Sequence, residues 1–217
     1  MNRIKAVLFD LDRTLVDRDS ALLDYARKIW RDANGPGAGG EERFMTSFVE
    51  LDARGRGDKR VLFQALVSEF LKNADADALR REFDDAFAST VRPFADAVPV
   101  VSALRSRGLL TGVVSNGRSR LQRAKLVHSG LLPFLDVVII SEEIGCKKPA
   151  PEIYQAALHG LRCRAEETAF VGDAEDLDIT GPKAVEMFTI LRRYSGDEFP
   201  TAADREVSSL SEIPAII

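Results

Sequence analysis

Residues 7–19, VLFDLDRTLVDRD, contain the pattern that decides the fold of this chain. A short apolar run, 4–9, ends at Asp10 and Asp12, and Thr14 follows two positions later. A continuous apolar run of this length is typical of a buried strand in a sheet that is covered on both faces. Asp10 and Asp12 follow at alternate positions, so their side chains point the same way.

Two carboxylates held side by side repel each other, unless a cation neutralises them or one of them takes a proton. A hard cation with oxygen ligands, such as Mg²⁺, fits this pair. The alternative is an exposed turn, because aspartate and threonine are also common turn residues. Taken alone, the stretch leaves both interpretations open.

Composition excludes several classes of protein. The chain has 217 residues, a net charge of −4 and two cysteines. General nucleic-acid binders need basic patches that displace counterions, and two cysteines give no disulfide framework. The apolar run before Asp10 is too short for a signal peptide, and none approaches the roughly 20 residues of a membrane span. We therefore expect a cytoplasmic protein, monomer or homodimer, with no nucleic-acid or membrane partner.

Four amphipathic helices follow the first strand, with no strand between them. Apolar residues recur at helical spacing from Ser20, over 41–53, after a capping residue at Asp58, and over 76–89. This arrangement predicts a four-helix bundle over 17–91. We expect the aromatic residues of these helices to form the core of the bundle: Trp30, Phe44, Phe48, Phe63, Phe70, Phe83 and Phe87.

After Pro93 the pattern changes to alternating helices and strands. The predicted strands are 109–115, 137–140, 168–172 and 187–193, with a final short strand that includes Glu206 and Val207. The predicted helices are 95–107, 119–128, 151–161 and 176–185. Alternation of this kind indicates an α/β fold, here a Rossmann-like parallel sheet with helices on both faces. We expect a core domain of residues 1–16 and 92–217, and a helical cap of residues 17–91 inserted after the first strand.

Three further strands lead to polar residues at the edge of the sheet where ligands bind in open parallel sheets. Ser115 and Asn116 could donate to a phosphate, and Gly117 would let the backbone approach it, although the same residues also suit a turn. Lys148 stands before Pro149 on a loop, where the alternative is a solvated pair with Lys147.

Asp173 follows the strand 168–172, and Asp176 and Asp178 come in the next helical turn. Acids in the first turn of a helix also stabilise the helix dipole, and this role alone could explain Asp176.

Together these segments resemble a known family. FDLDRTL (9–15), SNG (115–117), KKPAPEIY (147–154) and GDAEDLD (172–178) are similar, in this order, to the motifs of the haloacid dehalogenase-like hydrolase superfamily, in its branch with a helical cap. The resemblance covers almost the whole chain and implies a phosphatase that acts on a small phosphorylated metabolite.

The resemblance also implies roles. Asp10 would be the nucleophile that forms an aspartyl-phosphate, and Asp12 the acid and base. Lys148 would balance charge beside Asp10. Thr14, Ser115, Asn116 and Gly117 would orient the loop and hold the phosphate. Mg²⁺ would bind Asp10, the backbone carbonyl of Asp12, Asp173 and, through water, Asp178.

Asp12 favours phosphate chemistry over dehalogenation, because dehalogenases of this superfamily lack the second aspartate. Two alternatives stay open: a phosphotransferase or phosphomutase of the same superfamily, and a non-catalytic protein that binds a phosphorylated ligand. The substrate is not determined. Candidate cap contacts are Arg18, Arg54, Arg56 and Lys59, which could also be a solvated cluster, and Lys28, Lys59 and Lys72 are expected to face solvent.

Arg13 departs from the family pattern, where glycine is most common. A non-glycine residue predicts a negative φ and a side chain that leaves the phosphate pocket. That side chain would be solvated, pack at the hinge, or reach the cap or the leaving group. Further departures are Leu177, Pro182 and Glu186, which replace an asparagine, an alanine and a glycine of the pattern.

Overall fold

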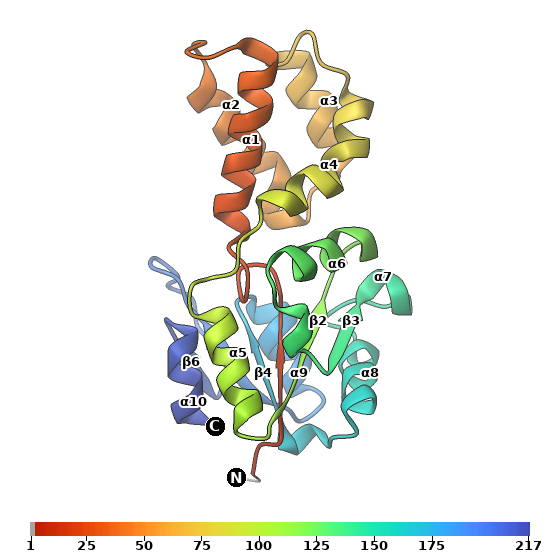
Figure 1. Cartoon of the computed structure of the whole chain (residues 1–217), viewed down its shortest axis with the longest axis vertical. Helices are drawn as coiled ribbons and strands as arrows, with labels where there is room; N and C mark the ends of the chain where they lie inside the picture. The colour runs from red at the N-terminus through yellow and green to blue at the C-terminus, as the bar shows by residue number, and fades with distance from the viewer. Residues whose placement is uncertain (1–2) are drawn as a thin grey trace. The chain divides into compact units, whose positions relative to one another are not determined.

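The chain divides into two compact units. The computed structural model describes residues 3–217. The core unit contains the residues up to Asp17 together with Arg92–Ile217, and the cap unit contains Arg18–Val91 (Figure 1). The first boundary therefore lies one residue later than the sequence predicts.

The core unit is built on a six-stranded parallel sheet with the strand order β3-β2-β1-β4-β5-β6. The strands are β1 (Ala6–Phe9), β2 (Leu110–Ser115), β3 (Val137–Ile140), β4 (Thr168–Gly172), β5 (Phe188–Arg192) and β6 (Arg205–Val207). The predicted parallel α/β fold is confirmed, and the predicted strands 137–140 and 168–172 have the expected bounds.

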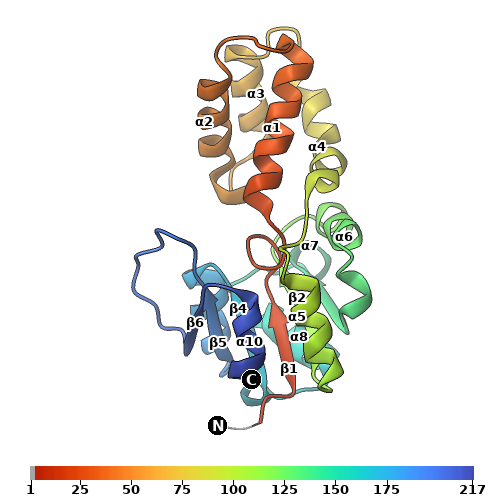
Figure 2. The same ribbon diagram turned by 60° about the vertical axis from the view of Figure 1, so that its left-hand side comes forward.

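Helices cover both faces of this sheet (Figures 1 and 2). They are α5 (Ala97–Ser106), α6 (Ser119–His128), α7 (Ser141–Ile144), α8 (Pro151–Leu161), α9 (Gly181–Lys183) and α10 (Ile213–Ile216). Helices α5 and α8 both contact β2 from opposite faces; α10 packs on α5, and α9 packs on α8. Within the part of the chain that the structure describes, every helix is too short or too polar to cross a membrane.

The predicted helix 176–185 is the main difference between expectation and structure. A π-helical turn, Glu175–Thr180, precedes the short helix α9. Pro182 has no backbone N–H, so it cannot continue the hydrogen-bond ladder of an α-helix. The side chain of Asp178 accepts hydrogen bonds from the N–H groups of Asp173 and Ala174 in the preceding loop. The four-residue helices α7 and α10 were not predicted, because they are too short to show a period.

The cap unit is a bundle of four helices, as predicted. They are α1 (Arg18–Asn34), α2 (Glu41–Asp52), α3 (Lys59–Glu69) and α4 (Ala76–Thr90). Phe44, Phe48, Phe63 and Phe83 are fully buried and form edge-to-face ring contacts, so the aromatic side chains are the bundle core. Asp58 caps α3, as predicted, through the N–H groups of residues 60 and 61.

The two hinge segments that join the units run side by side within the core unit. The N–H of Asp17 donates to the carbonyl of Arg92 at 2.9 Å, and the N–H of Phe94 donates to the carbonyl of Leu15 at 3.0 Å. The chain therefore leaves the core and returns to it at one point, directly after the loop that contains Asp10 and Asp12.

Candidate active site

The predicted site residues meet at the carboxyl edge of the sheet. Asp10 follows β1, Ser115 ends β2 and Asp173 follows β4, and these three strands are neighbours. From β1 the chain adds β2 and β3 on one side of the sheet, and then β4, β5 and β6 on the other side. In open parallel sheets, ligands bind at the point where the strand order changes sides in this way.

Three acids form a buried cluster at this edge. One carboxylate oxygen from each of Asp10, Asp173 and Asp178 lies within 4.8 Å of the other two. Burial penalises the charged form of each acid. It raises the pKa of Asp10 to about 7 and the pKa of Asp173 to about 6, and it also raises the pKa of Asp178. Converging carboxylate oxygens are the ligands that a hard cation such as Mg²⁺ prefers, so these residues fit the predicted metal.

Lys148 compensates two of these acids. Its Nζ lies 2.6 Å from Oδ1 of Asp10 and 2.7 Å from Oδ1 of Asp178. Burial alone would lower the pKa of Lys148, but the two carboxylates raise it above its ordinary value, so the ammonium stays charged. Lys148 is buried and Lys147 is exposed, so the alternative of a solvated lysine pair is wrong.

The side chain of Asn116 holds the backbone of Lys148. Its Oδ1 accepts from the N–H of Lys148 at 2.8 Å, and its Nδ2 donates to the carbonyl of Lys148 at 3.0 Å. The peptide bond between Lys148 and Pro149 is cis. Because both ends of the Asn116 amide are engaged here, a contribution of Asn116 to phosphate binding would come from its backbone N–H.

Asp178 fastens the loop after β4. Its Oδ2 accepts from the N–H groups of Asp173 at 3.2 Å and Ala174 at 3.0 Å, while its Oδ1 meets Lys148. A Cβ atom on Gly172 would lie 2.3 Å from the Asp178 side chain, so only glycine fits there. Asp178 therefore positions both Asp173 and Lys148.

The remaining predicted phosphate-binding groups differ in their surroundings. The Thr14 side chain is buried, and its Oγ1 has no hydrogen-bond partner among the described residues. The N–H of Gly117 donates to Oγ of Ser141 at 3.0 Å. The buried hydroxyl of Ser115 accepts from Nε2 of Gln122 at 2.5 Å.

The loop residue Arg13 contradicts the prediction in two ways. Its φ is +65°, in the left-handed region, where a negative value was expected. Only 14% of its side chain is exposed, so a solvated arginine is also wrong. Its Nε lies 2.7 Å from Oδ2 of Asp173, and its guanidinium stacks 4.7 Å from the ring centre of Tyr194. The Tyr194 hydroxyl also donates to the carbonyl of Arg13. Contacts to both the side chain and the backbone therefore hold this residue in its left-handed conformation. Packing of Arg13 at the hinge stays a prediction, as does its contact with the cap or the leaving group.

Sequence reasoning missed three buried polar residues around this loop. Gln122 and Lys125 lie one turn apart on α6 and both donate to the carboxylate of Asp12. Arg192, at the end of β5, donates to the carbonyl of Thr14 and stacks 3.8 Å from the ring centre of Phe94. The available signal was the charged residue Arg192 at the end of a largely apolar strand.

Two of the predicted cap contacts are engaged inside the cap unit. Arg18 forms two short contacts with Asp52, and Lys59 lies 2.9 Å from the same carboxylate. Lys59 was expected to face solvent, but only 14% of its side chain is exposed, because it turns back onto Asp52. Arg54 and Arg56 are exposed, as a solvated cluster requires.

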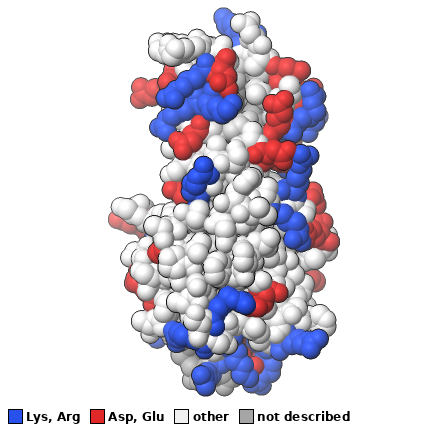
Figure 3. All heavy atoms as spheres, in the orientation of Figure 1, with Lys and Arg blue, Asp and Glu red and all other residues white. Residues whose placement is uncertain are grey.

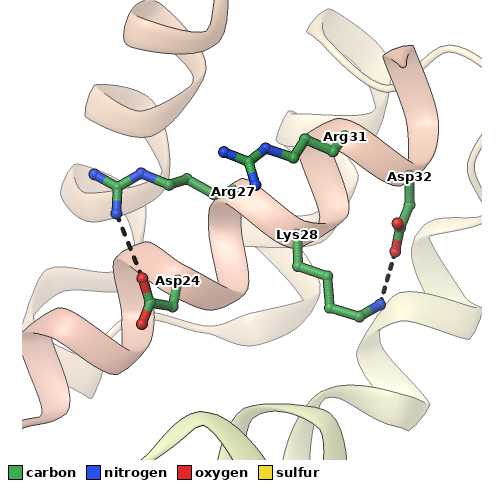
Figure 4. A pocket seen from close by; sticks show the side chains of 5 residues that line it. All are labelled: Asp24, Arg27, Lys28, Arg31 and Asp32. Carbon is green, nitrogen blue, oxygen red and sulfur yellow. Dashed lines mark hydrogen bonds and ion pairs between the residues drawn. The ribbon is translucent and has the colours of Figure 1, made fainter. Parts of the chain in front are cut away.

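Helix α1 carries a separate charged surface. Figure 3 shows positively and negatively charged side chains interspersed over one face of the cap unit. A shallow hollow on α1 is lined by Asp24, Arg27, Lys28, Arg31 and Asp32 (Figure 4). Lys28 pairs with Asp32 at 2.7 Å and both are largely exposed, so the predicted solvent exposure of Lys28 is confirmed. Such pairs between exposed side chains are typical of a solvated helix face.

Comparison with known proteins shows to which protein family this chain belongs. Residues 4–186 match the family model described as haloacid dehalogenase-like hydrolase. The chain therefore belongs to the haloacid dehalogenase-like hydrolase family.

Curated relatives include both phosphatases and a dehalogenase. The glyceraldehyde 3-phosphate phosphatase of Methanocaldococcus jannaschii is 29% identical over 99% of this chain and 97% of its own length. The (S)-2-haloacid dehalogenase 1 of Pseudomonas sp. is 29% identical over 100% of this chain and 98% of its own length. A HAD-hydrolase from Bacillus subtilis, solved bound to magnesium, superimposes with a TM-score of 0.81 at 25% identity, covering 99% of both chains.

Proposed function

We propose that this protein is a Mg²⁺-dependent phosphatase that hydrolyses a small phosphorylated metabolite. The observation that carries the proposal is the pair Asp10 and Asp12 on one loop beside the buried cluster of Asp173, Asp178 and Lys148. Phosphatases among the relatives, acting on glyceraldehyde 3-phosphate and phosphoserine, support the same reaction class. The cytoplasmic location and the oligomeric state stay predictions.

The reaction has two steps on this chain's own residues. The carboxylate of Asp10 attacks phosphorus, the bond to the leaving oxygen breaks, and Asp12 donates a proton to that oxygen. Asp12 then takes a proton from water, whose oxygen attacks the aspartyl-phosphate and releases inorganic phosphate and Asp10. The hydroxyl of Ser115 and the backbone N–H of Asn116 would bind the phosphoryl oxygens. The N–H of Gly117 would join them by exchanging its hydrogen bond to Oγ of Ser141. The Thr14 hydroxyl would orient the loop.

Charge balance favours a metal in this site. Within the described residues, the ion pairs of Asp10, Asp173 and Asp178 are with two cations, Lys148 and Arg13. When all three carboxylates are ionised, one negative charge is left where a phosphate dianion must approach. When bound, Mg²⁺ would neutralise charge on the phosphoryl oxygens. Asp10 and Asp173 would ligate it directly, with the backbone carbonyl of Asp12, and Asp178 would act through water.

The alternatives differ in a measurable way. Purified protein is assayed with Mg²⁺ and an aryl phosphate, with Asp10→Asn as the inactive control and circular dichroism to show that the variant folds. We expect phosphate release from wild type only. Equal rates for the two proteins would favour a non-catalytic, ligand-binding protein. Appearance of the phosphoryl group on a second acceptor, rather than on water, would favour a phosphotransferase or phosphomutase.

The substrate is addressed by measuring phosphate release across a panel of phosphorylated metabolites. The panel includes glyceraldehyde 3-phosphate and phosphoserine, because relatives act on them. A haloacid substrate belongs in the same panel, because a dehalogenase is also among the relatives. We expect no halide release, since Asp12 provides a proton that a departing halide does not need.

A further inference from the structure

The carboxylate of Asp12 is held by helix α6. Nζ of Lys125 lies 2.7 Å from Oδ1 and 2.7 Å from Oδ2 of Asp12. Nε2 of Gln122 lies 3.0 Å from Oδ2 and also donates to Oγ of Ser115. Two residues on one face of one helix therefore supply three donor contacts to a single carboxylate.

The burial of Lys125 shows that this contact is built into the fold. Its side chain is 2% exposed, whereas 23% of the Asp12 side chain is exposed. Lysine is almost never fully buried unless it is paired, because removing an ammonium from water is costly. A surface lysine that met Asp12 by chance would keep its head in solvent.

Gln122 adds an independent constraint. A Cβ atom on Gly117, whose φ is +148°, would lie 3.1 Å from Cγ of Gln122, so the glutamine packs directly against the SNG loop. The spacing of three residues on α6 places Gln122 and Lys125 on the same face. The helix thereby joins the loop after β1 to the loop after β2.

This arrangement controls a torsion that is otherwise soft. The terminal torsion of an aspartate is broad, so an exposed carboxyl samples many orientations. A cation that contacts both oxygens, with a second donor on one of them, fixes the plane of the carboxyl. When one oxygen carries a proton, the ammonium can stay on the other oxygen.

We propose that Lys125, assisted by Gln122, is a positioning residue that fixes the carboxyl of Asp12 for proton transfer to the leaving group. The inference rests on the proposed function and deepens it. Lys125 acts through Asp12 and is not itself assigned a contact with the phosphoryl group.

The consequence depends on the leaving group. A phosphate ester of an aliphatic alcohol needs a proton on its leaving oxygen, whereas a strongly acidic phenol departs as its anion. A positioned general acid contributes typically 10²–10⁴-fold. Loss of its orientation therefore slows the first substrate selectively, which a general loss of folding or of phosphate binding would not do.

The test compares kcat/KM of wild type and Lys125→Met with two substrates, glycerol 3-phosphate and 2,4-dinitrophenyl phosphate. The ratio kcat/KM reports the first chemical step, which forms the aspartyl-phosphate. We expect Lys125→Met to lose about 10²-fold with the alkyl ester and less than about 5-fold with the aryl ester, within the range for general acids. Lys125→Arg, which keeps a cation that can donate to both carboxylate oxygens, is expected to recover most of the alkyl-ester activity.

Two further variants complete the design. Arg123→Met is the matched control, because Arg123 lies on α6 but pairs with Glu143 at the surface. This variant should leave kcat/KM unchanged with both esters. Gln122→Leu removes the second donor while Lys125 stays. Because Gln122 also donates to Ser115, some loss is expected with both esters. The loss should still be larger with the alkyl ester, and this difference keeps the test decisive if Lys125→Met does not fold.

Equal losses with both esters, or no loss with either, would overturn the inference while the proposed function stands. If wild type releases phosphate from neither ester nor from any metabolite of the panel, the proposed function fails and this inference fails with it.

Discussion

Asp52→Asn should destabilise the cap unit strongly. Asp52 is 0% exposed, and its carboxylate meets both terminal nitrogens of Arg18 at 2.8 and 2.9 Å, Nζ of Lys59 at 2.9 Å and the N–H of Gly55 at 2.8 Å. The asparagine keeps one acceptor oxygen but removes the negative charge that Asp52 supplies to Arg18 and Lys59. Breaking a buried pair by removing one partner typically costs about 3–5 kcal/mol.

The chain provides its own probe for this measurement. Its single tryptophan, Trp30, lies in α1 and packs on Phe44, so tryptophan fluorescence reports the unfolding of the cap unit. With a urea m-value of about 1–3 kcal/mol/M, the expected loss moves the unfolding midpoint down by about 1 M or more. Asp24→Asn is the control, because Asp24 is 66% exposed and its pair with Arg27 is worth about 0–1 kcal/mol.

The pH dependence of this effect has a definite sign. Burial alone would raise the pKa of Asp52, but Arg18 and Lys59 hold it below its ordinary value of 3.8. The stability from a depressed pKa is present above that ordinary value and is lost as pH falls below it. The midpoint difference between wild type and Asp52→Asn should therefore be full at pH 7 and shrink in acid. A midpoint at pH 7 within 0.3 M of the Asp24→Asn midpoint, on the order of 0.5 kcal/mol, would refute the reasoning.

Three other predictions concern the core unit. Lys148→Met should lower kcat/KM by about 10²–10³-fold, as loss of one preorganised charge partner does, and an activity assay within threefold of wild type would contradict this. Mg²⁺ affinity, measured by titration calorimetry, should rise between pH 5 and pH 8. Asp10 and Asp173 have pKa values raised to about 7 and 6, and each must lose its proton before it can bind the metal. A flat profile would exclude competition between protons and Mg²⁺ for these carboxylates. Glu186→Gly should stabilise the protein by about 1 kcal/mol in urea unfolding, because Glu186 has a φ of +67° where glycine carries no steric cost; a loss of stability would show that the Glu186 side chain outweighs the strain.

The elements that are visible in the sequence are those whose signal is periodic or local. The buried run before Asp10, the alternation after Pro93 and the cap of α3 at Asp58 are all specified by nearby residues. The strand order then brings Asp10 and Asp173 together, although 162 residues separate the first strand from its partner in β4.

Contacts between distant residues were not visible. Arg13 adopts a left-handed backbone because its N–H closes a tight loop onto the carbonyl of Val16 and its side chain meets Asp173, 160 residues away. No propensity encodes such a contact. Lys125 looked like any polar residue on an amphipathic helix, since the acid that it faces lies 113 residues earlier. The role of each therefore depends on tertiary structure.

The insertion of the cap has a consequence for the order in which the protein folds during synthesis. Strand β1 leaves the ribosome first, but Ala6 pairs with Leu110 and Thr168, so both neighbours of this strand are made much later. The cap helices contact one another within residues 18–91 and are complete before either partner strand exists. We expect the cap to fold first, since local contacts form fastest. The apolar strand that leads to the proposed nucleophile then waits unpaired, a state in which a nascent chain depends most on chaperones.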